Sequence, residues 1–168
     1  MAHPGPAGDP AGIKGLPGAA QAFAKLAAAK APFVTRGDMS GTHVKELEVW
    51  EAAGIKPEGD WYDVFADGKK GNKPTTLYAE SKQAYVLMDR ATWLTVKKEL
   101  SLVPLVQGDP LLLNYIAVIA VNPEKVPGAD QKAAQAFIDW LRGSEAQGII
   151  KTFGVDTYGE PLFFPNAK

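Results

Sequence analysis

The stretch TRGDMSGTH, residues 35–43, lies between a short apolar run at 32–34 and a strongly helical run at 44–53. This order predicts a strand, a loop and the start of a helix. The first backbone N–H groups of a helix have no partner within the helix and carry partial positive charge. With the hydroxyls of Ser40 and Thr42 beside Gly41, and the guanidinium of Arg36 nearby, the loop predicts a site for a small anion. An ordinary N-cap is the alternative, since Ser and Thr are common at that position.

Strands and helices are predicted to alternate along the rest of the chain. The expected helices cover 19–31, 42–53, 75–81, 91–98, 131–141 and 144–153, and the expected strands cover 33–36, 61–65, 85–88, 102–106 and 114–122. This alternation favours an α/β fold. In the helix at 42–53, an apolar stripe is expected at Val44, Leu47, Trp50 and Ala53, with Glu46, Glu48 and Glu51 on the solvated face.

Composition divides the chain into three expected segments. Residues 1–18 are rich in Pro and Gly, which predicts a loop or arm. Residues 19–106 are expected to form an α/β lobe that carries the strand, loop and helix around residue 36. Residues 107–168 are expected to supply a strand, two helices and an apolar tail.

Charge and composition argue against several classes of protein. The 168 residues carry a net charge of −1 and no basic stripe, so a nucleic-acid partner is not expected. No apolar run reaches the length of a membrane span. The chain has no cysteine, which excludes disulfides, thiolate metal ligands and cysteine nucleophiles. The two histidines, His3 and His43, lack the spacing of a metal-binding pair, so no metal site is expected.

Catalytic motifs do not emerge from the sequence either. Ser40, His43 and Asp38 could be written as a triad, but residues three apart on a helix do not meet its geometry. The glycines at 37 and 41 do not have the spacing of a phosphate-binding loop, so no nucleotide cofactor is predicted. The lysines at 69, 70 and 73 are most simply a solvated loop. We therefore expect a binding protein with no catalytic residues rather than an enzyme.

Short motifs in a fixed order run nearly end to end through the chain. They are DPAGIKG (9–15), APFVTRGD (31–38), SGTH (40–43), GDWY (59–62), DRATWL (89–94), GDPLLLN (108–114), AFIDWL (136–141), FGVD (153–156) and GEPLFFP (159–165). In these motifs the chain resembles the tungstate-binding proteins of bacterial and archaeal ABC importers. That family has the type II periplasmic-binding fold.

The resemblance implies a role in transport. Members of the family capture tungstate, and often molybdate, outside the membrane and deliver it to an ABC permease. Carried over by position, the implied oxyanion ligands are Arg36, Ser40, Gly41 and Thr42, with Thr35 where the family usually has Ser. The implied location is periplasmic, or extracellular and membrane-associated, and no cofactor is implied.

The chain departs from the family pattern in two places. The family begins with a further lobe that carries a Thr/Ser-rich anion loop, and nothing before Asp9 resembles it. The implied fold is therefore a truncated one, with the second lobe and the C-terminal part of the first. Apolar faces at Phe137, Ile138 and Leu141 would then be exposed, which predicts self-association as a homo-oligomer or an element-swapped dimer. In addition, residues 65–76 are polar and basic where the family has a short Gly-rich turn.

Two other binding functions stay open on the sequence. Phosphate-binding proteins of the same fold carry Arg-x-Asp-x-Ser-Gly-Thr, which Arg36 to Thr42 also match. An inward Asp38 would suit the proton of hydrogen phosphate, whereas an outward Asp38 would suit a fully deprotonated dianion. The second alternative is a ligand-sensing regulatory module, because this fold also serves sensors.

Overall fold

The structure is a computed structural model that describes residues 1–167. In chain order its elements are β1 (Ala2–Gly5), α1 (Ala19–Ala29), β2 (Phe33–Thr35), α2 (Gly41–Ala52), β3 (Tyr62–Val64), η1 (Gly68–Lys70), α3 (Asn72–Lys82), β4 (Tyr85–Val86), α4 (Arg90–Val96), η2 (Lys97–Glu99), β5 (Val103–Gln107), η3 (Pro110–Leu112), α5 (Gln131–Arg142), α6 (Ser144–Thr152) and α7 (Val155–Tyr158). They form two compact units, Met1–Asn114 and the residues from Tyr115 onward. The expected α/β class is confirmed.

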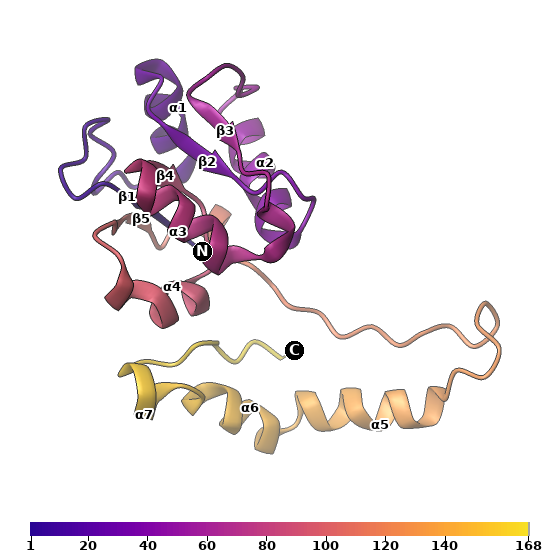
Figure 1. The fold of residues 1–168 in the computed structure, drawn as a ribbon. Coiled ribbons are helices and arrows are strands. Elements are labelled where there is room, and N and C mark those ends of the chain that lie inside the picture. The colour runs from indigo at the N-terminus through magenta and orange to yellow at the C-terminus, as the bar shows by residue number, and fades with distance from the viewer. Residues whose placement is uncertain (168) are drawn as a thin grey trace. The chain divides into compact units, whose positions relative to one another are not determined.

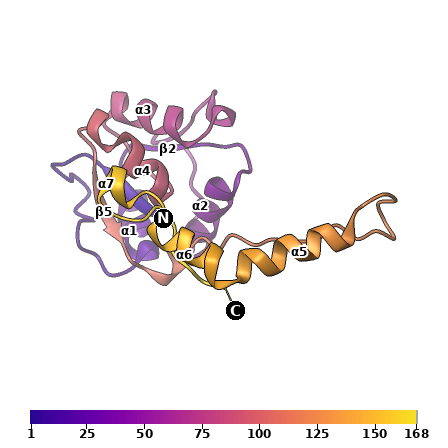
Figure 2. The same cartoon turned by 90° about the horizontal axis from the view of Figure 1, so that it is seen from below.

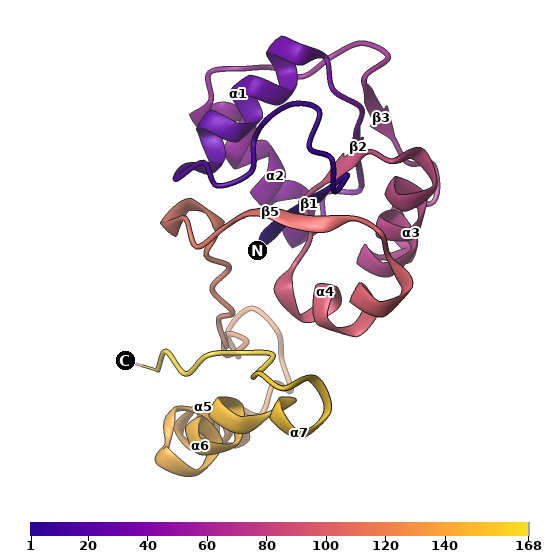
Figure 3. The same cartoon turned by 90° about the vertical axis from the view of Figure 1, so that its left-hand side faces the viewer.

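A three-stranded parallel sheet in the order β3-β2-β4 forms the centre of the first unit. Side chains alternate between its two faces, as the pleat of a strand requires. Phe33 and Tyr85 belong to the core cluster that includes residues of α1 and α2, whereas Val34 and Val86 pack with Ala79 of α3. Figure 3 shows α1 and α2 on one side of β2 and α3 on the other. Both faces of the sheet are therefore covered, which is typical of parallel sheets.

Parallel strands bring the starts of three helices to one edge of this sheet. β2 is followed by α2, β3 by η1 and α3, and β4 by α4, so each helix begins beyond the carboxyl end of its strand (Figure 1). In open α/β sheets this edge is the usual place for a ligand. The fold thus gathers helix N-termini, with their unpaired N–H groups, at one place in the unit.

A second, two-stranded sheet corrects the prediction of an arm at the N-terminus. β1 pairs antiparallel with β5, with a register shift between His3 and Pro4, and Ala2 also bridges to Met88. All four residues of β1 are buried, and the His3 ring packs edge-on against Phe23 at 4.4 Å between centroids. The Ala-His-Pro-Gly sequence has no alternating pattern. Its strand conformation follows from pairing with a segment about 100 residues away.

The buried face of α2 differs from the predicted one. Thr42, His43, Glu46, Val49 and Trp50 are buried, whereas Val44 and Leu47 are 37% and 36% exposed. The prediction for Glu46 was wrong, because its side chain lies in the interior rather than on the solvated face. The cause is that polar partners from β2 and β3 hydrogen-bond to this face of the helix. A polar side chain was therefore not sufficient to predict the solvent-exposed face.

The second unit contains α5, α6 and α7, and α5 and α6 follow each other at Gly143 (Figure 2). The helices predicted at 131–141 and 144–153 are confirmed. The strand predicted at 114–122 is not found, since 115–122 has no regular structure. Apolar β-branched residues favour a strand only when a neighbouring strand supplies hydrogen bonds, and no strand among residues 1–167 pairs with this segment. The units also divide after Asn114 rather than at 106.

Candidate functional site

The anion site predicted around Arg36 lies where β2 passes into α2. Ser40 is the N-cap of α2, and its Oγ accepts a hydrogen bond from the N–H of His43 at 3.4 Å. The next two N–H groups, those of Gly41 and Thr42, have no hydrogen-bond acceptor within residues 1–167. The N-cap interpretation of Ser40 is therefore confirmed, and two unpaired amides remain beside it. These amides can donate to an anion.

The loop between β2 and α2 is held by its own polar groups. Gly37 and Met39 have φ values of 61° and 58°, in the left-handed region that glycine tolerates best. Met39 N–H donates to Nδ1 of His43 at 3.0 Å. Because Nδ1 accepts, the neutral ring carries its hydrogen on Nε2. Burial and Arg36 lower the pKa of His43, although Asp38 opposes them. His43 thus supports the loop, and its ring does not pair with the Ser40 hydroxyl as a triad would require.

Arg36 is oriented by two acceptors. Its Nη2 donates to Asp38 Oδ2 at 2.6 Å, and its Nη1 donates to Asn72 Oδ1 at 2.5 Å. Its Nε is buried and has no hydrogen-bond partner among the described residues. A guanidinium has five N–H donors, so three remain after these two bonds. Arg36 is therefore fixed in place and keeps donors for a further ligand.

Asp38 turns toward Arg36 and the start of α2. One carboxylate oxygen accepts from Arg36, and the other accepts from the N–H of Ser40 at 3.1 Å. Burial raises the pKa of Asp38, but hydrogen bonds from Ser40 and Arg36 and the charge of Arg36 outweigh it and hold the pKa below its ordinary value. Asp38 is thus a carboxylate at neutral pH, and both its oxygens are already hydrogen-bonded.

Asn72 was not predicted to belong to the site, and Asp89 was interpreted only as a local ion pair or a helix cap. Asn72, the first residue of α3, donates through Nδ2 to Thr42 Oγ1 at 3.0 Å and to Asp89 Oδ2. Asp89 caps α4 through the N–H of Thr92 at 2.7 Å. Asn72 lay in the polar, basic segment that was assigned to solvent. Pro74 indicated a helix start nearby, because proline is tolerated in the first turn of a helix, but no local pattern indicated a role for Asn72 itself. Asn72 therefore joins the starts of α2, α3 and α4.

Thr35 makes different contacts from the other four predicted ligands. It is buried at the end of β2, and its Oγ1 accepts from the N–H of Gly37 at 3.3 Å. It also hydrogen-bonds to Glu46, which accepts from Tyr62 Oη at 2.6 Å and Trp50 Nε1 at 3.3 Å. Burial raises the pKa of Glu46 to about 7, although these hydrogen bonds favour the charged form. Thr35 thus links the loop of the predicted anion site to a buried polar network.

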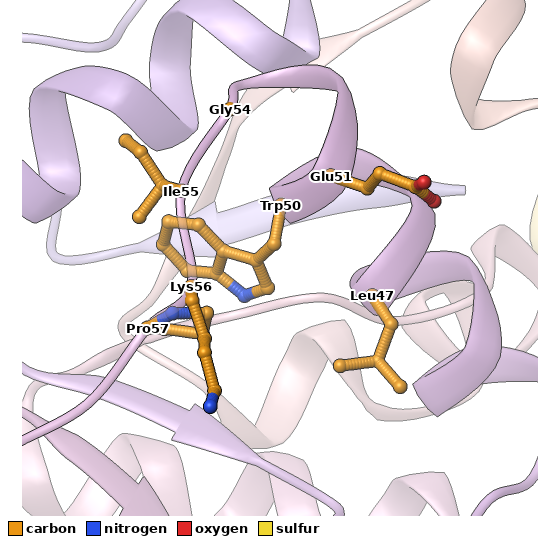
Figure 4. Close-up of a pocket in the computed structure, with 7 residues that line it drawn as sticks. All are labelled: Leu47, Trp50, Glu51, Gly54, Ile55, Lys56 and Pro57. Carbon is orange, nitrogen blue, oxygen red and sulfur yellow. The ribbon is translucent and has the colours of Figure 1, made fainter.

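An apolar hollow lies at the other end of α2 from the anion site. It is lined by Leu47, Trp50, Glu51, Gly54, Ile55, Lys56 and Pro57 (Figure 4). Indole and aliphatic side chains dominate its wall, and its charged side chains are one glutamate and one lysine. Such a lining does not suit a small dianion, which needs several donors.

Two further features of the described residues bear on other functions. Among residues 1–167, no group of three or more His, Cys, Asp or Glu is placed to hold a metal ion. Likewise, none of the helices described is both long and apolar enough to cross a bilayer.

Comparison with known proteins identifies the family. A model described as the PBP superfamily domain matches residues 2–145. The chain belongs to this family. The expected periplasmic-binding-protein-like fold is thereby confirmed. Among the relatives of this PBP domain is the tungstate-binding protein TupA of Peptoclostridium acidaminophilum, 41% identical over 165 residues.

Two solved structures are similar to this PBP domain. The tungstate-binding protein TupA from Desulfovibrio alaskensis G20 is 35% identical, with a TM-score of 0.82 over 99% of this chain and 67% of that one. The tungstate ABC transporter structure from Geobacter sulfurreducens is 37% identical, with a TM-score of 0.75 over 90% of this chain and 63% of that one. The chain spans 57% of the Peptoclostridium protein, so it corresponds to a little over half the length of that relative.

Proposed function

We propose that this PBP domain is part of the solute-binding component of an ABC importer and binds tungstate, or molybdate, at the start of α2. The two unpaired amides of Gly41 and Thr42 beside the fixed guanidinium of Arg36 carry this proposal. Relatives with names of tungstate-binding proteins support the choice of ion.

The donors at this place suit a tetrahedral dianion. A fully deprotonated oxyanion can only accept hydrogen bonds, so its site must offer donors. We assign this role to the remaining N–H groups of Arg36, the amides of Gly41 and Thr42, and the hydroxyl of Thr42, whereas the hydroxyl of Ser40 already hydrogen-bonds to Asp38. The hydroxyl of Thr35 faces Glu46, so we give Thr35 a supporting role rather than direct contact with the ion.

The orientation of Asp38 favours tungstate over phosphate. Hydrogen phosphate carries a proton at neutral pH and needs an acceptor in its site. Both oxygens of Asp38 are engaged, one with Arg36 and one with Ser40. Because these partners turn Asp38 toward Arg36 and the start of α2, we do not assign it as the acceptor of that proton. Phosphate is therefore our second candidate.

The proposed importer also implies a place and a partner. We infer that the domain works outside the cytoplasmic membrane, in the periplasm or at the outer cell surface, and releases its ion to an ABC permease. We infer no enzymatic activity, because the polar residues at the site pair with one another or with backbone groups rather than as nucleophile and base.

Isothermal titration calorimetry tests the proposal directly. Sodium tungstate, sodium molybdate and sodium phosphate are titrated separately into the protein at pH 7.5. We expect saturable binding of tungstate or molybdate, and phosphate weaker by at least about tenfold, since an unpaired proton in a desolvated site costs about 1–3 kcal/mol. Tighter binding of phosphate would contradict the assignment and favour the second candidate.

A further inference from the structure

Asn72 connects four separate segments through one side-chain amide. Its Oδ1 accepts from Nη1 of Arg36 at 2.5 Å, beyond the end of β2. Its Nδ2 donates to Thr42 Oγ1 at 3.0 Å on α2, and also to Asp89 Oδ2 at the start of α4. Asn72 itself is the first residue of α3. All three polar contacts of its side chain are therefore made to groups at the edge of the sheet where the anion site lies.

The partners of Asn72 allow only one orientation of its amide. Arg36 can only donate, so it must face the amide oxygen. Asp89 is an acceptor when ionised, so it must face the amide nitrogen. Rotating the amide by half a turn would place two donors together at Arg36 and two acceptors together at Asp89. The amide is therefore locked, and its N–H group is held against Thr42.

This lock controls the hydrogen of the Thr42 hydroxyl. A hydroxyl has one hydrogen to donate and two lone pairs that accept. The N–H of Asn72 occupies a lone pair of Thr42 Oγ1. The Thr42 hydroxyl hydrogen therefore cannot point at Asn72 and is available for another acceptor. The N–H of Thr42 also has no acceptor within residues 1–167, so both donors of Thr42 are unused.

The same amide limits the motion of Arg36. Asp38 holds Nη2 of the guanidinium and Asn72 holds Nη1. With only Asp38, the planar group could pivot about a single contact. With both, its plane is fixed, and the cost of ordering it has been met before a ligand arrives. Asn72 thus positions two of the groups that we propose bind the oxyanion, the Arg36 guanidinium and the Thr42 hydroxyl.

We propose that Asn72 is a positioning residue for oxyanion binding, which fixes the Arg36 guanidinium and turns the Thr42 hydroxyl hydrogen toward the ion. This proposal rests on the proposed function. It adds a residue of α3 to a site otherwise built from the β2–α2 loop, and it explains why a polar segment lies at this edge of the sheet. Asn72 acts through Arg36 and Thr42 and need not touch the ion.

A double-mutant cycle with the full chain tests this role. Tungstate affinity is measured by calorimetry for the wild type, Asn72→Ala, Thr42→Val and the double variant. Thr42→Val keeps the shape of the side chain and removes the hydroxyl. We expect Asn72→Ala to weaken binding about 10- to 100-fold in the wild type, since it loosens a charged donor and a neutral one. In the Thr42→Val background, Asn72→Ala should weaken tungstate binding markedly less, because the Thr42 hydroxyl that Asn72 positions is already absent.

Two further variants separate positioning from a structural effect. Lys73→Ala, next to Asn72 and exposed in an ion pair with Glu99, is the matched control and should bind like the wild type. Asn72→Asp keeps the size of the side chain and an acceptor for Arg36, but loses the donors, so it should bind no better than Asn72→Ala. The melting temperature of each ligand-free variant shows whether it folds. The coupling between Asn72 and Thr42 is calculated from the four tungstate affinities. If Asn72 had a purely structural role, the effects of the two substitutions on the binding free energy would be additive.

The outcomes distinguish the two proposals. If the wild type binds tungstate and Asn72→Ala binds it within about twofold as tightly, Asn72 does not have the proposed role. The same conclusion follows if Asn72→Ala weakens binding equally in the wild-type and Thr42→Val backgrounds. Either result would leave the proposed function intact. No binding of tungstate or molybdate by the wild type would overturn the proposed function and this inference with it. A loss for Asn72→Ala that shrinks in the Thr42→Val background would support both.

Discussion

At the scale of single residues, the site combines fixed charges with unused donors. Arg36 and Asp38 form an ion pair in which the two side chains are only 11% and 7% exposed. Burying such a pair is costly unless other hydrogen bonds complete it, and Ser40 and Asn72 supply them. The pair brings no net charge to the loop, so attraction for a dianion must come from N–H groups and hydroxyls directed at it.

Arg36 should matter far more for binding than a lysine of the neighbouring basic segment. Arg36→Ala removes charge-assisted donors and leaves the charge of Asp38 unbalanced, so we expect tungstate binding to weaken by about 2–5 kcal/mol. Lys69→Ala changes an exposed side chain and should cost about 1 kcal/mol or less. Calorimetric titration of both variants checks this prediction. Equal losses would mean that the ion binds elsewhere, such as at the basic segment.

Glu46 should make the stability of the domain depend on pH. Glu46 is 2% exposed, and burial raises the pKa of its carboxyl to about 7 from 4.5. Between these two values the folded state holds a proton that the unfolded state has lost. Stability due to Glu46 is therefore fully present below pH 4.5 and is lost as pH rises through about 7, by at most about 3 kcal/mol.

The variant Glu46→Gln isolates this effect, because it resembles the protonated carboxyl and does not titrate. Urea unfolding of wild type and variant from pH 5 to pH 8.5 measures it. We expect the wild type to lose stability relative to the variant as pH rises. Other buried groups, such as His3, are common to both proteins and cancel in the difference. A difference that stays constant with pH would show that Glu46 titrates normally.

At the scale of elements, local signals predicted the strand, loop and helix at the site but not their packing. The apolar run at Phe33 and Val34, followed by Ser40 as a cap, was enough to predict β2 and α2. The capping role depends on a single turn of chain and can be read from sequence. The buried face of α2 could not be predicted from sequence, because the burial of Glu46 depends on its partners Tyr62 on β3 and Thr35 on β2.

Contacts between distant segments account for the other errors. β1 exists because it pairs with β5, and 115–122 is not a strand because no neighbour pairs with it. The contribution of Asn72 depends on the arrangement of β2, α3 and α4 around one edge. No spacing within residues 65–76 indicates it. The sequence therefore predicted the residues of the β2–α2 loop, and it missed those brought to it by the sheet.

Gly68 is required by the close approach of η1 to the loop. A Cβ atom at this position would lie 1.9 Å from the carbonyl oxygen of Arg36. We expect Gly68→Ala to destabilise the fold by about 1–3 kcal/mol and to weaken oxyanion binding, because either η1 or Arg36 must shift. Chemical denaturation and calorimetry measure the two effects. Gly8→Ala is the control, since nothing lies within 4 Å of a Cβ there. Similar stability of both variants would contradict this account.

At the scale of the whole molecule, the two units differ in how well they bury apolar side chains. The first unit has a core that includes Phe23, Phe33 and Trp50. The second unit leaves Ile119 and Phe137 84% and 54% exposed, and α5 has no buried residue. Exposed apolar side chains favour association where they meet in one patch. Of the three residues predicted to be exposed, Phe137 is exposed, whereas Ile138 and Leu141 are half-buried.

The exposed apolar side chains of the second unit should cause self-association. We expect light scattering after size-exclusion chromatography to give a mass above that of one chain, increasing with concentration. Phe137→Glu disrupts the stack of Phe137 on Trp140 and adds charge, so it should lower the mass, whereas Lys132→Glu on the same helix should not. A monodisperse monomer for the unaltered chain would refute the prediction.

The most direct test of the oxyanion site is to observe the backbone amides at the start of α2 during titration with tungstate. In ¹⁵N–¹H spectra we predict the largest chemical-shift changes at Gly41 and Thr42, with smaller changes at Ser40 and Asn72. The chemical shifts of the amides of the second unit, and of Lys69, Lys70 and Lys73, should change little. Saturating changes centred on residues 69–70, or none at Gly41 and Thr42, would contradict the account.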